Sequence, residues 1–308
     1  MHGRRCPFCQ SDSSRLVGTR VDVWVKCRNC RSVFRDITPD RFQQIHGDAF
    51  QDSEYLESSV ALTGQQPSGA LWKALSLPGT SVLEIGPGSG HLLAAAQRAG
   101  CSVEAVESSK LHRNYIRDVW GIGSLYATID EVPDDRSYDV IVAVNVFEHV
   151  YDIAEFLHFI RKALAPGGTF FLSTPNGLSL EATVLGSWWP MCKVHDHVSF
   201  PSPVGVRLAA RGSGLRVERV WSTELPFEFP VSALAAVRDR VSARRGARET
   251  NGDCRVQAPA GPADAGSVNP AARSALARFY SAAGPFDPTS RLLGTLGRAA
   301  SVKARLTR

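Results

Sequence analysis

Residues 82–90 read VLEIGPGSG, an apolar run typical of a buried strand that ends in three alternating glycines. Residues 92–99 follow as LLAAAQRA, which has helical character. Glycine has no Cβ, so Gly86, Gly88 and Gly90 let the backbone approach a ligand closely. A helix that begins just after them also presents unpaired N–H groups to the ligand. The stretch therefore predicts a strand, a loop and a helix that together bind a nucleotide.

The spacing of these glycines argues against a dinucleotide cofactor. The fingerprint of NAD- and FAD-binding units, G-x-G-x-x-G, requires glycine at position 91, where this chain has histidine. A second strand-like run, residues 102–106, ends in Glu107, twenty-three residues after Glu84. In nucleotide-binding α/β units a carboxylate at that place meets the ribose hydroxyls, so both motifs indicate the same kind of site.

Two later segments complete the pattern. An apolar run at residues 138–144 leads into Asn145 and the segment EHV at 148–150, and PGG at 166–168 precedes another strand-like run. In this combination residues 75–225, about half the chain, resemble the class I, Rossmann-like S-adenosylmethionine-dependent methyltransferases. The resemblance implies an α/β fold in which helices cover both faces of a Rossmann-like sheet.

The segment after EHV predicts a helix. Asp152 can cap its N-terminus, and Glu155 completes the spacing of a capping box. Apolar residues recur on one face, so the helix is expected to pack on the sheet. This arrangement places Glu148 and His149 at the carboxyl end of the fourth strand, the edge at which open α/β sheets bind their ligands.

The resemblance also implies which residues hold S-adenosylmethionine. Glu84 and the loop of residues 86–90 form the cofactor motif, and the loop passes under the methionine moiety. Glu107 holds the ribose hydroxyls, and Asn145 lies near the methionine or methyl end. Many relatives contact the adenine amino group with an acid just after the third strand, where this chain reads LYATI. Asp130 is the nearest acid, so the adenine contact stays open.

Four of the seven cysteines form a metal-binding pattern. Two C-x-x-C pairs, Cys6 with Cys9 and Cys27 with Cys30, are separated by seventeen residues, a spacing typical of a zinc ribbon. Four thiolates close the tetrahedral shell of one zinc ion and leave no open position for a substrate, so the zinc is expected to be structural. The alternative, two redox-active pairs, lacks the surrounding βαβ pattern that such pairs have.

The length of 308 residues predicts one α/β domain with additional segments. We predict a cationic zinc ribbon at residues 1–41, a helical cap or linker at 42–75, and a methyltransferase domain at 76–308. Within the cap, Tyr55 is a candidate contact of the cofactor, although packing against the sheet also explains an aromatic residue there. A basic, partly flexible insertion is predicted at about 232–298, before a final strand.

Charge and hydropathy indicate the compartment and the partners. No apolar run approaches the ~18–20 residues of a membrane span, and the first residues show no apolar signal region. Since the cysteine pattern indicates a reducing compartment, we expect a cytoplasmic protein without a membrane partner. Residues 232–308 carry thirteen basic and five acidic side chains. This surplus fits an anionic or carrier-bound small-molecule acceptor, although a solvated charged surface is the simpler explanation of it.

Histidines are the candidates for acid–base chemistry. Methyl transfer from a sulfonium is an in-line displacement, and a hydroxyl acceptor must lose its proton during it. Histidine titrates near neutral pH and suits this step. The two candidates for the general base are His149, in the EHV segment, and His195, which lies near a cluster of aromatic residues. His197 is interpreted as a hydrogen-bonded element of the fold, and the remaining histidines, His46 among them, as surface or core residues.

The sequence predicts an enzyme that methylates a hydroxyl of a small metabolite, with sugars and specialised metabolites as the best-fitting acceptors, ahead of amines and carbon. The Ala- and Arg-rich composition is typical of high-GC bacteria, in which such enzymes often tailor natural products. An RNA methyltransferase is the second hypothesis, because a zinc ribbon also precedes this fold in enzymes that modify ribosomal RNA. The base-methylating motif N/D-P-P-Y/F is missing, since residues 145–148 read NVFE. A non-catalytic scaffold and a sulfonium-assisted rearrangement are further alternatives.

Overall fold

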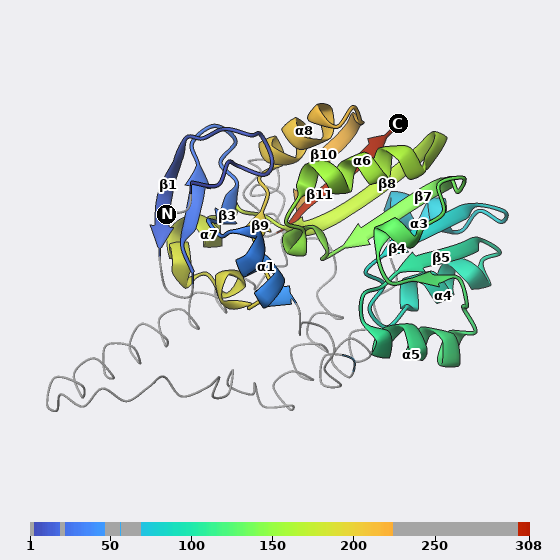
Figure 1. Ribbon diagram of the computed structural model, residues 1–308. Helices are drawn as coiled ribbons and strands as arrows, with labels where there is room; N and C mark the ends of the chain where they lie inside the picture. Colours follow the sequence, from blue (N-terminus) through green and yellow to red (C-terminus); the bar gives the residue numbers. More distant parts are fainter. Residues whose placement is uncertain (1–2, 19–21, 47–55, 57–68, 224–300) are drawn as a thin grey trace, which may run out of the picture.

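The computed structural model describes residues 3–18, 22–46, 56, 69–223 and 301–308, and its main feature is a large β-sheet (Figure 1). The strands of this sheet, in chain order, are β4 Ser81–Ile85, β5 Ser102–Val106, β6 Leu125–Tyr126, β7 Tyr138–Val144, β8 Leu164–Pro175, β10 Arg216–Thr223 and β11 Ser301–Thr307. Their spatial order is β10-β11-β8-β7-β4-β5-β6.

The large sheet has the mixed topology of a doubly wound α/β fold. Strand β4 runs parallel to β5 and β7, β5 parallel to β6, and β7 parallel to β8. Strand β11 lies between β8 and β10 and is antiparallel to both. Helices alternate with the parallel strands along the chain. The predicted Rossmann-like α/β fold is therefore confirmed.

Helices cover both faces of the large sheet (Figure 1). They are α3 Gly69–Leu75, α4 His91–Arg98, α5 Lys110–Trp120, α6 Ile153–Ala163 and α8 Pro203–Gly212. In β7, Ile141 and Ala143 pack in one core with residues of α6 and α8. Val140 and Val142 pack in another core with residues of α3 and α4. Successive side chains of a strand point to opposite faces, which explains why β7 is apolar along most of its length.

Helix α6 begins where the sequence predicts. The Asp152 Oδ1 atom accepts a hydrogen bond from the backbone N–H of Glu155 at 2.9 Å, so the N-cap is confirmed. The next strand is longer than predicted, because β8 begins at Leu164 and includes the PGG segment. Glycine is required within it, since a Cβ on Gly168 would lie 2.8 Å from the carbonyl oxygen of Tyr138.

A second, four-stranded sheet joins the N-terminal segment to the rest of the protein. Strands β1 Ser14–Gly18, β2 Trp24–Cys27 and β3 Val33–Arg35 come from that segment, and the sheet order is β1-β2-β3-β9. The fourth strand, β9 Ser199–Phe200, comes from much further along the chain and pairs antiparallel with β3. Buried Trp24 of β2 stacks on buried Phe200 with 5.2 Å between ring centroids. The N-terminal module therefore shares a sheet with the chain that follows β8.

Shorter elements complete the described chain: helices α1 Pro39–His46 and α7 Leu180–Leu185, and the 3-10 helices η1 Ile129–Glu131, η2 Phe147–His149, η3 Gly186–Trp188 and η4 Pro190–Lys193. Tyr55 and the predicted insertion at 232–298 lie outside the described residues, as does much of the predicted cap at 42–75. Within the part of the chain that the structure describes, no helix is long and apolar enough to cross a membrane.

Candidate functional site

The glycine loop after β4 has a backbone that only glycine adopts easily. Gly86, Gly88 and Gly90 have φ angles of 64°, 54° and 75°, in the left-handed region. A Cβ on Gly86 would lie 2.5 Å from Cγ2 of Val146, and a Cβ on Gly90 would lie 2.8 Å from Cγ1 of Ile116. A side chain at Gly86 or Gly90 would therefore collide with a neighbouring residue, which explains glycine at these two positions.

A cavity of about 250 Å³ opens beside this loop. It lies at the carboxyl ends of β4, β5 and β7, the edge at which open α/β sheets bind ligands. The residues that line it are His46, Ile85, Gly86, Gly88, Val106, Glu107, Ser108, Ala127, Asn145, Val146, His149, Val150 and Phe156. One continuous cavity therefore joins the predicted ribose-binding carboxylate to one of the two predicted catalytic histidines.

Glu107 lies at the end of β5, where the sequence predicts the ribose-binding carboxylate. Its Oε1 atom accepts a hydrogen bond from the backbone N–H of Ser109 at 2.8 Å, which fixes the orientation of the carboxylate. Burial raises the pKa of Glu107 to about 6, and hydrogen bonds from the backbone of Ser109 and Gly88 oppose that rise. Glu107 is therefore mainly a carboxylate at neutral pH and suits the acceptance of hydrogen bonds from a diol.

Of the other predicted cofactor residues, Asn145 lies on the cavity wall and Glu84 is buried outside it. Asn145 lines the cavity directly after β7 and holds a left-handed φ of 55°, which is uncommon for a residue other than glycine. Glu84 is buried behind the wall, where it accepts a hydrogen bond from the backbone N–H of Leu93, and burial raises its pKa to about 8. Asp130 does not line this cavity, and Ala127 occupies the wall after β6.

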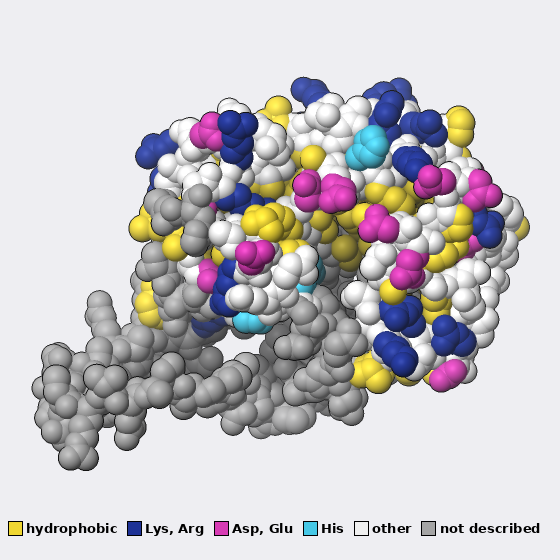
Figure 2. Space-filling model, in the orientation of Figure 1, with side chains coloured by type: hydrophobic (Ala, Val, Ile, Leu, Met, Phe, Trp, Pro, Cys, Tyr) yellow, Lys and Arg dark blue, Asp and Glu magenta, His cyan; other side chains and the backbone are white. Residues whose placement is uncertain are grey.

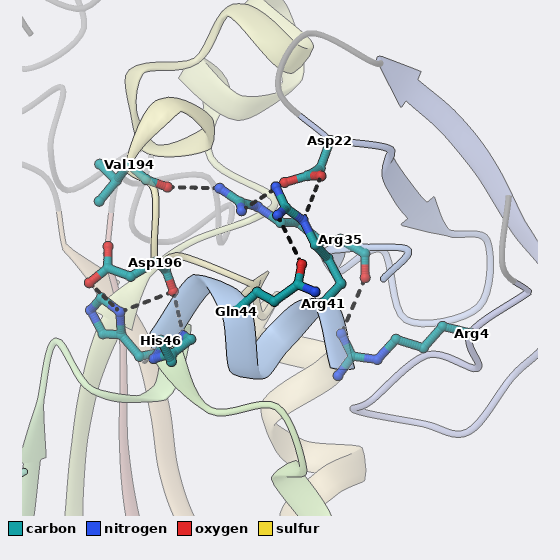
Figure 3. Close-up of polar contacts among 9 residues, drawn as sticks. Arg4, Asp22, Arg35, Arg41, Gln44, His46, Val194 and Asp196 are labelled. Atoms are coloured by element: carbon teal, nitrogen blue, oxygen red, sulfur yellow. Dashed lines mark hydrogen bonds and ion pairs between the residues drawn. The ribbon is translucent and has the colours of Figure 1, made fainter. Parts of the chain in front are cut away.

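His149 forms a pair with Asp196 at the other end of the cavity. The Nδ1 atom of His149 lies 3.3 Å from Asp196 Oδ2 and 3.3 Å from the carbonyl oxygen of Asp196. From helix α1, the Nε2 atom of His46 lies 3.0 Å from the same carbonyl oxygen, and Figure 3 shows His46 directed at Asp196. Asp196 is thus held between two histidines from different parts of the chain.

Each member of the His149–Asp196 pair favours the charged form of the other. Burial lowers the pKa of His149, but its hydrogen bond with Asp196 and the nearby carboxylates outweigh burial, so the pKa is raised above its usual 6.5. Burial opposes charge on Asp196, yet the hydrogen bond and the charge of His149 hold its pKa at about 2. An anionic Asp196 therefore makes His149 a stronger base and fixes the orientation of its ring.

Two further buried groups adjoin His149. The ring of His197 lies 4.8 Å from that of His149, and its Nδ1 atom is 3.1 Å from the carbonyl oxygen of Met191. Burial, and then the charge of His149, lower the pKa of His197 to about 4, and the same two causes lower the pKa of His46 to about 4. Glu148 accepts a hydrogen bond from Thr174 Oγ1 at 2.8 Å, and burial raises its pKa. His46 and His197 are therefore neutral at pH 7, whereas Asp196 beside His149 is anionic.

The structure separates the two predicted catalytic histidines. His149 lines the cavity, whereas the exposed His195 does not. Sequence reasoning missed Asp196 and assigned His46 to the surface or core, whereas the structure places His46 on the wall of the cavity. The segment KVHDHV at 193–198 carried a signal, an acid between two histidines, but only the fold reveals which histidine the acid meets.

The four predicted metal ligands converge on one point. The Cys6 and Cys30 sulfurs are 3.5 Å apart, the Cys9 and Cys27 sulfurs 3.6 Å apart, and all four lie within 4.8 Å of one another. Sulfurs around tetrahedral zinc lie about 3.8 Å apart, given a Zn–S bond of about 2.3 Å. The set therefore fits one zinc ion with a closed coordination shell.

A family model described as "Methyltransferase domain" matches residues 52–220, more than half of the chain. This range contains the glycine loop, Glu107, the EHV segment and the segment with Asp196.

Two of the curated relatives, one bacterial and one human, have the same name. "Ubiquinone biosynthesis O-methyltransferase" of Rickettsia prowazekii is 28% identical over 139 residues, which cover 40% of this chain and 53% of that protein. The mitochondrial human protein of the same name is 28% identical over 163 residues, which cover 47% of this chain and 43% of the human one. The chain thus spans about half the length of these curated relatives.

Among solved structures, the cyclopropane synthase MmaA2 of Mycobacterium tuberculosis superposes with a TM-score of 0.52 at 16% identity, covering 89% of this chain and 100% of that one. Phosphoethanolamine N-methyltransferase 2 of Haemonchus contortus, solved with S-adenosylmethionine, gives a TM-score of 0.51 at 14% identity and covers 90% of this chain and 61% of that one. At these identities the likeness shows the fold alone.

Proposed function

The chain belongs to the methyltransferase domain family, and from this premise we propose that it transfers a methyl group from S-adenosylmethionine to a hydroxyl of a small molecule. The observation that carries the proposal is the continuous cavity between Glu107 and His149. A cofactor whose ribose is held at Glu107 extends along the glycine loop toward Asn145 and His149. The base and the methyl donor then share one cavity.

The residues of the cavity fit this cofactor. Gly86 and Gly88 line the cavity without a Cβ, so the backbone there can approach the methionine moiety closely, and the carboxylate of Glu107 suits the ribose diol. S-adenosylmethionine, when bound, supplies an electrophilic methyl group on a sulfonium. The chain's own part is to hold that group beside the acceptor and to exclude water from between them.

His149 performs the proton transfer in this mechanism. Asp196 accepts a hydrogen bond from the Nδ1–H of His149, so Nε2 is the ring nitrogen that takes the proton of the acceptor hydroxyl. S-adenosylmethionine held by Glu107 and the glycine loop would supply the methyl group to the acceptor oxygen, and its sulfur would keep the electron pair of the former bond to that group. The proton resides on His149 and the charge of Asp196 stabilises it.

The names of the curated relatives support oxygen as the atom that is methylated, because both are O-methyltransferases. The surface in Figure 2 also favours a small acceptor over RNA: on that face, among the described residues, lysines and arginines are interspersed with acidic side chains. Sugars and phenols are the first acceptors to test. We further propose that zinc is held by the four cysteines as a structural ion.

The pH dependence of turnover tests the His149–Asp196 pair. His149 must be neutral to accept a proton, and its pKa is raised, so turnover should rise with pH through a value above 6.5. In Asp196→Asn the anion that raises this pKa is gone, so the rise should move to lower pH. Turnover at the plateau should also fall by about 10–100-fold, the cost of a hydrogen bond to a charged group.

A pH series of kcat for wild type, Asp196→Asn and the exposed control Asp134→Asn provides the measurement. The control should keep the wild-type profile, because Asp134 lies away from the cavity. A profile of Asp196→Asn that coincides with wild type would exclude Asp196 as the partner of the base.

Glu107→Ala tests the cofactor site. If its carboxylate holds the ribose, the substitution should weaken S-adenosylmethionine binding by about 1–3 kcal/mol, or about 5–150-fold in Kd. Calorimetric titration of the two proteins measures this directly. Asp130→Ala is the matched control, because Asp130 is exposed and does not line the cavity. Equal affinities of Glu107→Ala and wild type would contradict the assignment.

A further inference from the structure

The N-terminal ribbon supplies part of the framework of the site. We propose that Arg35 of the ribbon is a positioning residue, which holds the segment at 194–198 so that Asp196 faces His149. The inference rests on the proposed function, because it concerns the base of that reaction. It gives the ribbon a role in ordering the catalytic pair.

The side chain of Arg35 joins the ribbon to the segment that carries Asp196. It is fully buried at the end of β3, where its Nη1 atom is 3.0 Å from Asp22 Oδ2 and its Nη2 atom donates to the carbonyl oxygen of Val194 at 2.9 Å (Figure 3). The guanidinium carbon lies 5.0 Å from the centre of the Trp24 ring. The two terminal nitrogens of the Arg35 guanidinium, Nη1 and Nη2, are therefore both held in place by hydrogen bonds.

The contacts of Arg35 bracket Asp196. The side chain donates to the carbonyl of Val194, and the backbone N–H of Arg35 donates to the carbonyl of Val198 at 2.8 Å. Asp196 sits midway between these two anchored positions. Since β9 follows immediately and pairs with β3, the whole segment is fixed to the ribbon before and after Asp196.

The ribbon also anchors the chain just beyond His149. Arg4 donates from Nη2 to the carbonyl oxygen of Tyr151 at 2.6 Å and from Nη1 to the carbonyl oxygen of Arg35 at 3.2 Å. Its guanidinium carbon lies 3.9 Å from the centre of the Tyr151 ring. Two ribbon arginines thus hold the two chain segments that contribute His149 and Asp196.

The cysteine site is connected to the same framework. The hydroxyl of Ser202 donates to the carbonyl oxygen of Cys30, and the backbone N–H of Ser202 donates to Ser32 Oγ at 3.0 Å. Cys30 ends the turn between β2 and β3, and Ser202 follows β9. The order of β3, and with it the position of Arg35, is therefore linked to the cysteine turn.

The direction in which the pKa of His149 changes when Arg35 is replaced shows whether Arg35 positions Asp196 or acts on His149 through its charge. Removing a cation near His149 would by itself raise the pKa of His149. Releasing Asp196 would instead lower that pKa, since Asp196 is the group that raises it. The other titratable groups that face His149 are Glu148, His197 and His46, and none of them is changed in the test.

The experiment measures the pKa of His149 by NMR in the full zinc-loaded chain labelled with nitrogen-15 histidine. Arg35→Ala should lower the pKa of His149 toward the value found in Asp196→Asn. Arg35→Lys should lower it less, because the lysine ammonium can keep only part of the contacts that the two guanidinium nitrogens make with Asp22 and Val194. Arg41→Ala is the matched control: Arg41 also approaches Asp22, at 3.7 Å, and has a partly exposed side chain. It should leave the pKa of His149 unchanged.

A folded, zinc-loaded Arg35→Ala protein in which the pKa of His149 is unchanged or raised would overturn the inference. If that variant loses zinc, Arg35→Lys decides: a lowered pKa supports positioning, and an unchanged one overturns it. Calorimetric titration with S-adenosylmethionine on the same samples separates this inference from the proposed function. Absent binding in wild type would refute the proposed function, whereas the NMR result concerns the His149–Asp196 geometry alone.

Discussion

Replacing His149 with alanine should lower the turnover of methyl transfer by about 10²–10⁴-fold, the usual contribution of a positioned general base. The substitution removes the ring that lines the cavity and pairs with Asp196. The affinity for S-adenosylmethionine should change little, because the proposed ribose contact at Glu107 and the glycine loop are left intact. Single-turnover kinetics with a phenolic or sugar acceptor, together with calorimetric titration of the cofactor, measure both quantities.

His158→Ala is the control for His149→Ala. His158 lies on the exposed face of α6 and does not line the cavity that contains His149. Its loss should leave turnover near the wild-type value. His195→Ala provides the comparison between the two histidines that the sequence proposes as bases. A large loss of turnover in His195→Ala with normal turnover in His149→Ala would reverse the assignment of the base.

Cys30→Ser should abolish zinc binding and unfold the N-terminal ribbon. Structural zinc contributes about 10–16 kcal/mol to the folding of small zinc modules, so removing one of four ligands affects the entire module. Because β9 pairs with β3 of the ribbon, the loss should extend to the segment that carries Asp196. Metal analysis should fall from about one zinc per chain to about none, and hydrogen exchange should increase over residues 3–46 and 194–202.

Cys101→Ser is the matched control for this prediction. Cys101 is buried in a different core, and its sulfur contacts the carbonyl oxygen of Leu75 at 3.2 Å. The variant should keep its zinc and the protection of the ribbon. A Cys30→Ser protein that holds zinc and keeps a protected ribbon would show that the four cysteines are not the metal site.

The parts of the fold set by short-range constraints were predictable. Alternating glycines are required where a Cβ would collide with Val146 or Ile116, and that requirement is visible as a sequence pattern. The N-cap of α6 follows from Asp152 and its spacing to Glu155. The two C-x-x-C pairs predict a metal cluster, because each pair is local and only their meeting is long-range.

The pairing of His149 with Asp196 could not be predicted, because it depends on a contact between distant segments. His149 and Asp196 are separated by 47 residues, and His46 and Asp196 by 150. Nothing in the local pattern distinguishes Asp196 as the partner of His149 from an acid on the surface. The candidate His195 is only one residue from Asp196, yet it is exposed, since the orientation of each side chain in this turn is set by anchors at Val194 and Val198.

In the ribbon too, the local feature was predictable from the sequence and the long-range contact was not. Its metal cluster is visible in the sequence, but its attachment through β9 is not. That strand is two residues long and pairs with a partner more than 160 residues away. A strand this short has no recognisable period, so only the fold reveals the shared sheet.

The proposed cofactor site is tested by calorimetric titration of the zinc-loaded protein with S-adenosylmethionine and with its demethylated product. Both ligands should bind with micromolar affinity, since both carry the ribose and the amino acid moiety that the cavity is proposed to hold. Absence of binding by a folded protein with its zinc in place would contradict the account and favour a cofactor fold that serves only as a scaffold.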